Sequence, residues 1–164
     1  MKRWLWLVAL AGCDKGQHRV IDDDKLDTDR TRTIHKQFEA LAVQMRKMWA
    51  EKKAFPIGVS AKLPKQRDLE CCGVDPATGK NTLQCPPDPD FKTDPMWSKL
   101  EFSIDEPSFY RFEYHGTNAS VFTVFATGDV DCDRVSVEFT MGGVVEPDGK
   151  LKLWAWQQQP LDEF

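Results

Sequence analysis

The stretch Tyr110-Arg111-Phe112-Glu113-Tyr114 decides how the second half of this 164-residue chain folds. Aromatic and charged residues alternate in it. Because successive side chains of a β-strand point to opposite faces, this pattern predicts a strand with one buried face. Similar alternation occurs at residues 100–104, 122–126, 135–139 and 151–153, with turn residues in between. The second half of the chain is therefore predicted to form an antiparallel meander of four to six strands.

The stretch ahead of these strands predicts the cover for one face of the sheet. Apolar residues recur there at steps of three and four, which is the spacing of one helix face. The helix is expected from about Thr28 to Lys53, and Pro56 stops it. Its apolar stripe consists of Ile34, Phe38, Leu41, Met45 and Met48. The expected fold class is α+β: one long N-terminal amphipathic helix packed on an antiparallel β-meander.

Between the helix and the strands lies a region that is predicted to be irregular. Residues 56–96 contain seven of the ten prolines and three of the five cysteines. Prolines interrupt both helices and strands, so this region is predicted to consist of loops that disulfide bonds hold together.

The first residues have the order of an export signal. Lys2 and Arg3 are followed by an apolar run, residues 4–11, which is too short to span a bilayer. The run ends in Leu10-Ala11-Gly12-Cys13, which resembles the lipobox of bacterial lipoproteins. That resemblance implies cleavage before Cys13 and acyl chains, palmitate among them, on Cys13. It places the mature chain on a membrane, facing the periplasm or the cell exterior. Inner and outer membrane both stay open.

Once Cys13 is acylated, four cysteines remain: Cys71, Cys72, Cys85 and Cys132. An even number of cysteines in an exported chain predicts two disulfides. A bridge between the neighbours Cys71 and Cys72 is disfavoured by strain. One of the two is therefore expected to pair with Cys85 and the other with Cys132, and both assignments stay open. A zinc site is the competing interpretation, but the spacing does not form two C-x-x-C knuckles.

Charge and composition limit the partners. Removing residues 1–12 deletes Lys2 and Arg3 and leaves 20 basic against 26 acidic residues. An acidic balance argues against a nucleic-acid surface and against electrostatic docking on anionic lipid.

Together, these patterns predict the organisation of the chain. We expect a signal peptide at residues 1–12, a polar tether at 13–27, one α+β domain at 28–158 and a tail at 159–164.

Local motifs suggest a family for that domain. The strings are Phe38-Glu39-Ala40-Leu41, the stretch 49–56 ending in Phe55-Pro56, and Phe125-Ala126-Thr127-Gly128-Asp129-Val130-Asp131. With the aromatic residues between 97 and 114, they resemble the series found in type IV pilins and pseudopilins. The resemblance implies a pilin-like head. The polar stretch after Cys13 departs from the apolar pilin helix, so the chain is not expected to polymerise as a pilin.

A calcium site is the alternative interpretation of one acidic motif. Asp129, Asp131 and Asp133 resemble the start of a calcium loop. Arg134 stands where the turn glycine belongs, and Thr140 stands where the bidentate glutamate belongs. A polar hairpin turn is the simpler interpretation. No cofactor is otherwise expected.

The remaining candidates concern binding and catalysis. Trp154 and Trp156 alternate with Leu153 and Ala155 on the last predicted strand, so both of its faces are apolar or aromatic. One face is expected in the core, and the other is either a partner surface or covered by helix and loop, since exposed aromatic residues often anchor interfaces. His18, His35 and His115 stand in no recognisable catalytic spacing. We expect a non-enzymatic envelope interaction protein, accessory to pilus or secretion assembly or to adhesion, whose partner is another envelope protein. The alternatives are a calcium-dependent binding module and an envelope enzyme.

Overall fold

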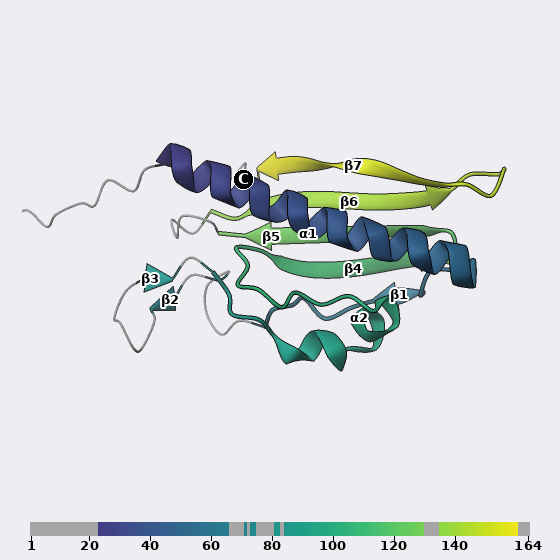
Figure 1. Ribbon diagram of the computed structural model, residues 1–164, viewed down its shortest axis with the longest axis horizontal. Helices are drawn as coiled ribbons and strands as arrows, with labels where there is room; N and C mark the ends of the chain where they lie inside the picture. Colours follow the sequence, from purple (N-terminus) through teal and green to yellow (C-terminus); the bar gives the residue numbers. More distant parts are fainter. Residues whose placement is uncertain are drawn as a thin grey trace, which may run out of the picture.

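The computed structural model describes residues 23–65, 71, 73–74, 81–82, 84–129 and 135–160 (Figure 1). The helices are α1 (Asp23–Lys52), the 3-10 helix η1 (Pro89–Lys92) and α2 (Pro95–Leu100). The strands are β1 (Gly58–Val59), β2 (Gly73–Val74), β3 (Asn81–Thr82), β4 (Arg111–Asn118), β5 (Val121–Gly128), β6 (Val137–Val145) and β7 (Leu151–Pro160).

Five of the strands form one antiparallel sheet in the order β1-β4-β5-β6-β7, while β2 and β3 form a separate hairpin. Strands β4 to β7 are neighbours in the sheet in the same order as in the chain, an arrangement that antiparallel strands permit because short connections can join them. Strand β1 does not belong to this series. It comes from the segment after α1 and pairs with β4, Val59 standing opposite His115.

Both helices pack on the same face of this sheet. The Phe38 ring of α1 meets the Phe112 ring edge-on at 5.9 Å, and Trp97 of α2 lies 6.3 Å from Tyr114. The Tyr114 hydroxyl donates to the Pro56 carbonyl at 2.7 Å, and burial raises the pKa of this phenol. The apolar face of α1 is buried with these aromatic side chains. Its buried residues are Ile34, Phe38, Leu41, Met45 and Met48.

The predicted architecture, a single long helix on a pilin-like meander, is wrong. The five-stranded antiparallel sheet is the dominant layer, there are two α-helices rather than one in the described chain, and the sheet is not a simple meander because β1 occupies its edge. The strand predicted at residues 100–104 is also absent, since residues 95–100 form α2. Helix α1 begins at Asp23, within the predicted tether. Acidic residues at a helix N-terminus are favoured by the helix dipole, which explains the earlier start.

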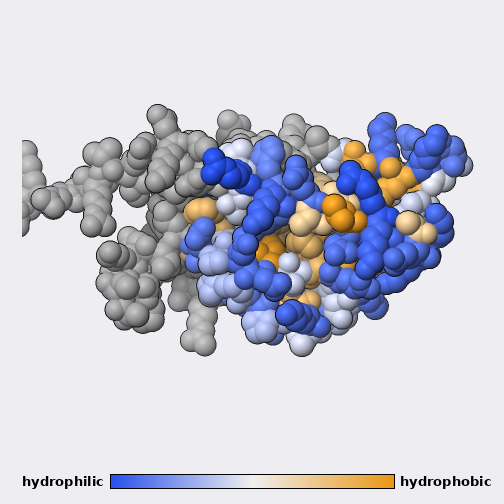
Figure 2. Space-filling view, viewed as in Figure 1, coloured by the Kyte–Doolittle hydropathy of each residue, from blue (hydrophilic) through white to orange (hydrophobic). Residues whose placement is uncertain are grey.

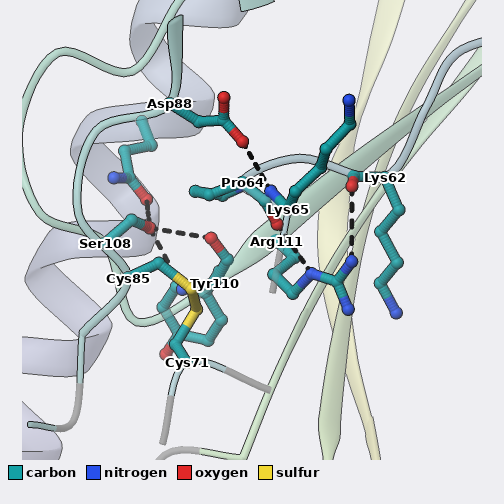
Figure 3. Close-up of a disulfide and its surroundings, with 10 residues drawn as sticks. Lys62, Pro64, Lys65, Cys71, Cys85, Asp88, Ser108, Tyr110 and Arg111 are labelled. Carbon is teal, nitrogen blue, oxygen red and sulfur yellow. Dashed lines mark hydrogen bonds between the residues drawn. A yellow bond between two sulfur atoms is a disulfide. The ribbon is translucent and has the colours of Figure 1, made fainter. Parts of the chain in front are cut away.

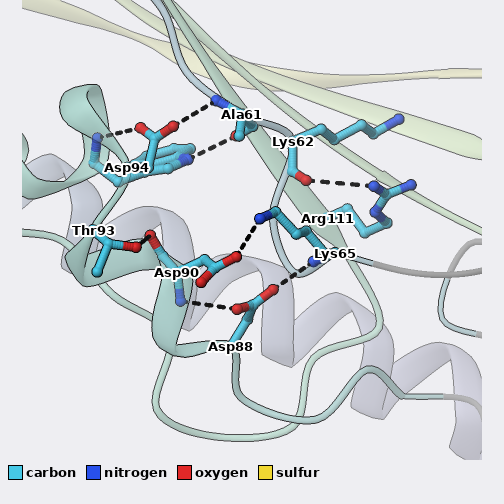
Figure 4. A network of polar contacts seen from close by, with 9 residues as sticks. Ala61, Lys62, Lys65, Asp88, Asp90, Thr93, Asp94 and Arg111 are labelled. Carbon is cyan, nitrogen blue, oxygen red and sulfur yellow. Dashed lines mark hydrogen bonds and ion pairs between the residues drawn. The ribbon is translucent and has the colours of Figure 1, made fainter.

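A network of polar contacts fixes α2 to the segment after β1 (Figure 4). The Asp94 carboxylate accepts hydrogen bonds from the backbone N–H groups of Met96 and Trp97, which caps α2. The same carboxylate accepts from the Ala61 N–H at 2.9 Å, while the Trp97 indole donates to the Ala61 carbonyl at 2.9 Å. These bonds satisfy the backbone of a segment that has no regular structure.

A disulfide joins Cys71 to Cys85 in the irregular region (Figure 3). Cys85 also exchanges two backbone hydrogen bonds with Ser108, at 2.7 and 3.0 Å. The disulfide is thereby tied to the chain just ahead of β4. This bond is one of the two pairings that the sequence left open. Cys72 and Cys132 lie outside the described residues, so their pairing stays a prediction, as does acylation of Cys13.

Candidate protein-binding face

The alternation of side chains divides the five-stranded sheet into two faces of different character. Phe112 and Tyr114 in β4, Phe122 in β5 and Met141 in β6 point to the helices and are nearly inaccessible to solvent. The residues between them point to the opposite side. Among the described elements, no helix packs on that side (Figure 1). We call this side the open face.

The register of the strands shows which residues share the open face. Paired residues of an antiparallel sheet point to the same side, so their side chains form rows across the strands. One row runs from Val59 through His115, Thr123 and Gly142 to Trp154. The next row includes Glu113, Phe125 and Thr140, and a third is Val121, Val144 and Lys152.

The row from Val59 to Trp154 exposes two large apolar side chains. Val59 is 59% exposed and Trp154 is 39% exposed. Ile57, the residue before β1, is 65% exposed. Three of the five exposed large hydrophobic residues of the described chain thus lie on or beside the open face. Thr127, at the far end of β5, is buried, so the open face is the half of the sheet nearer the β4–β5 turn.

A glycine places the indole of Trp154. Gly142 lies opposite Trp154 in the neighbouring strand, and a Cβ atom at Gly142 would overlap the indole ring. The ring therefore lies across the backbone of β6 and extends toward the middle of the sheet. Gly143 does the same on the covered face, where a Cβ atom would crowd the ring of Phe122. The two neighbouring glycines let an aromatic side chain pack closely on each face.

A histidine in the middle of the row is held by two neighbours. His115 Nε2 lies 2.8 Å from a carboxylate oxygen of Glu113, and the His115 ring meets the Phe125 ring edge-on at 5.0 Å. Both side chains of the His115–Glu113 pair are partly exposed. The sequence alone predicted no partner for His115. The available signal was the spacing of two residues, which puts both side chains on one face of a strand.

The predicted site residues are distributed as follows. Trp154 lies on the open face, whereas the side chain of Trp156 is outside the described residues. Asp129 is 2% exposed at the end of β5, and Asp131 and Asp133 are not among the described residues. Within the described chain, no group of three or more metal-ligating side chains gathers. The calcium interpretation of this motif therefore stays a prediction.

The side of the molecule that carries α1 has a groove, whereas the open face is a flat sheet surface. A groove of about 640 Å³ lies between α1 and residues 102–109. Phe102, Ile104 and Phe109 form its apolar part. An exposed ion pair joins Lys36 on α1 to Glu106 on the opposite wall at 2.8 Å. Figure 2 shows this side of the molecule, where hydrophilic residues predominate and hydrophobic patches are small and separate.

Comparisons with protein-family models, curated proteins and solved structures gave no match for this chain. Within the described residues, no helix has the length and apolar character needed to cross a bilayer. The function proposed below therefore rests on the predicted signal peptide and on the open face.

Proposed function

We propose that this protein is a lipid-anchored, non-enzymatic interaction module of the bacterial cell envelope and that it binds protein through the open face. The single observation that supports binding is the exposure of Val59 and Trp154 in one row of a sheet face on which none of the described helices packs. Aromatic side chains are enriched in protein interfaces and often act as their anchors.

The anchor follows from the lipobox that ends at Cys13. Each buried methylene of an acyl chain contributes roughly 0.8 kcal/mol, so two or three chains hold a protein on a membrane stably. Only ten residue steps separate Cys13 from the first residue of α1. A chain of that length reaches at most about 35 Å, which keeps the domain close to the membrane surface.

The anchor is tested by Cys13→Ser. We expect wild-type protein to sediment with membranes and its intact mass to include acyl groups, and we expect the variant to lose both properties. A wild-type mass without acyl groups would refute lipid anchoring. The experiment leaves the folded domain unchanged and does not depend on which partner is bound.

Binding is tested by a photoreactive amino acid placed at two valines in living cells. Val59 and Val43 are exposed to nearly the same extent, 59% and 60%, but Val43 lies on α1. We expect adducts of defined mass from position 59 and none from position 43. Equal labelling from both positions, or none from position 59, would contradict binding through the open face.

A further inference from the structure

The open face carries few charged side chains, which allows it to pack against the open face of a second copy of the chain. The chain as a whole carries 26 acidic against 22 basic residues, so the net charge opposes association of two copies. The three rows of the open face differ from this. Their titratable side chains are Glu113 and His115, which contact each other, and Lys152 in β7. Lys152 is itself paired with Glu146 at 3.6 Å. Two such faces can meet without an accumulation of like charge.

We propose that the open face is the interface of a homodimer, with a two-fold axis running along β5. This inference rests on the proposed function, because it names the partner of the same face. Sheets that pack face to face keep their strands roughly aligned and lie about 10 Å apart. Rotation by 180° about an axis parallel to β5 keeps each row at the same position along the strands. It reverses the order of the strands from one edge of the sheet to the other. β4 then faces β6 of the other copy, and β1 faces β7.

This arrangement covers the exposed apolar residues of both outer strands. Val59 lies in the strand at one edge and Trp154 in the strand at the other edge, and both belong to the same row. Because the indole reaches inward over Gly142, it would face His115 and Val59 of the second copy. Symmetry makes this contact twice. Phe125 and Thr123 would lie on the axis, each opposite its own counterpart.

The size of the face indicates the class of interface to which the dimer belongs. Five strands spaced about 4.8 Å apart, over three rows about 7 Å apart, give a flat footprint of roughly 400 Å². The side chains that project from the sheet add to the accessible area that is buried. This brings the buried area near the lower limit of specific interfaces, about 600 Å² per partner. We therefore expect a dimer that dissociates at micromolar concentration. Confinement of both copies to one membrane raises their effective concentration and favours the dimer.

Sedimentation equilibrium of the full-length protein in a density-matched detergent tests the dimer. We expect a reversible monomer–dimer equilibrium for wild type. The dissociation constant should rise at least tenfold for Val59→Glu and for Trp154→Lys. It should stay within about twofold of wild type for Val43→Glu, which adds the same charge at equal exposure outside the interface. Circular dichroism and thermal unfolding establish that each variant is folded.

Mixing the two interface variants tests the arrangement itself. In a heterodimer of Val59→Glu with Trp154→Lys, one contact places the introduced glutamate against the introduced lysine, and the other keeps the wild-type Val59 and Trp154. We expect the mixture to associate more tightly than either variant alone. A mixture no tighter than the variants alone would overturn the two-fold axis along β5. A wild-type protein that stays monomeric at about 100 μM would overturn the dimer. A photo-adduct at position 59 with another protein would then still support the proposed function.

Discussion

The two faces of the five-stranded sheet are built from the same strands yet serve different ends. On the covered face, Phe112, Tyr114 and Phe122 are fully buried against the helices. On the open face, the residues between them, such as His115 and Phe125, keep part of their surface in water. Alternation along a strand thus assigns each residue to one face, and only the packing of helices makes one face the core.

The difference between the two faces separates stability from recognition. Apolar surface removed from water stabilises the fold by roughly 25 cal/mol per Å², so the covered face supplies most of the folding free energy. An apolar side chain that stays exposed contributes little to folding and keeps its surface available for association. Substitutions on the two faces should therefore affect different measurements.

Two tryptophans on opposite faces provide the largest test of this difference. Trp97 is fully buried, and its ring lies 5.4 Å from Phe91 and 5.7 Å from Phe102. We expect Trp97→Ala to lower the free energy of unfolding by about 4 kcal/mol, from the lost burial and the cavity that remains. Denaturant unfolding followed by circular dichroism measures this loss.

Trp154→Ala is the matched control for that substitution. Its indole is 39% exposed and its contact over Gly142 is lost on truncation, so we expect a loss of about 2 kcal/mol, roughly half that of Trp97→Ala. Its effect should also be seen in association. Equal losses of stability from the two tryptophans would contradict the division between a core face and a recognition face.

The Cys71–Cys85 disulfide belongs to neither face, and its removal should have the next largest effect. The two cysteines are 14 positions apart, and a loop of this size gives a stabilisation of about 3 kcal/mol in the chain-entropy model. We expect Cys71→Ala combined with Cys85→Ala to lower the free energy of unfolding by up to this amount. The dimer constant should change little, because the bond lies outside the open face. Trypsin leaves Cys71 and Cys72 together in the peptide 68–80, so fragment ions that break the chain between the two cysteines must place the link to Cys85 on Cys71, or the pairing is wrong.

The sequence predicted the parts of the fold that depend on periodicity. Alternation placed strands at Phe112, at Phe122 and at Leu151, and strands are present at each position. The apolar stripe of α1 was likewise visible, because five buried residues repeat at helical spacing. A periodic pattern of this kind can be recognised within one helix or strand, without knowledge of the segments that pack against it.

Other parts depend on contacts between distant segments, which periodicity does not report. Strand β1 has only two residues and exists because it pairs with β4, so no pattern of its own marks it. Residues 100–104 alternate like a strand, yet Asp94 and Pro95 start α2 just before them. That signal, a capping residue followed by proline, was present in the sequence and outweighs a short alternation.

The open face shows the same limit for function. Trp154 was predicted as a partner surface from alternation of aromatic residues alone. Val59 was not predicted, since its position beside His115 depends on the β1–β4 register. The role of Gly142 was also hidden, because only the neighbouring strand shows why a side chain there would displace the indole. A binding face made of rows across strands becomes visible only once the register is known.

The smallest predicted effect concerns the charge on Asp94, which caps α2 and links it to the segment after β1. Desolvation raises the pKa of this carboxyl, but hydrogen bonds from the N–H groups of Trp97, Ala61 and Met96 outweigh it and lower the pKa below the ordinary value. A lowered pKa means that the charged form stabilises the fold. This stabilisation is present above the unfolded-state pKa, about 4, and is lost as the pH falls through the lower folded-state pKa.

Two substitutions separate the cap from the charge. At pH 7, Asp94→Ala should lower the free energy of unfolding by about 1 kcal/mol, because the helix cap is lost. Asp94→Asn should cost less, since asparagine also caps helices. The difference between wild type and Asp94→Asn should shrink as the pH is lowered below about 4, because the wild-type carboxylate then becomes protonated. Asp148→Asn, at an exposed carboxylate beside Lys150, serves as the control, and its effect should disappear in high salt. A constant gap between wild type and Asp94→Asn from about pH 7 to pH 3 would show that the ionised carboxylate does not stabilise α2.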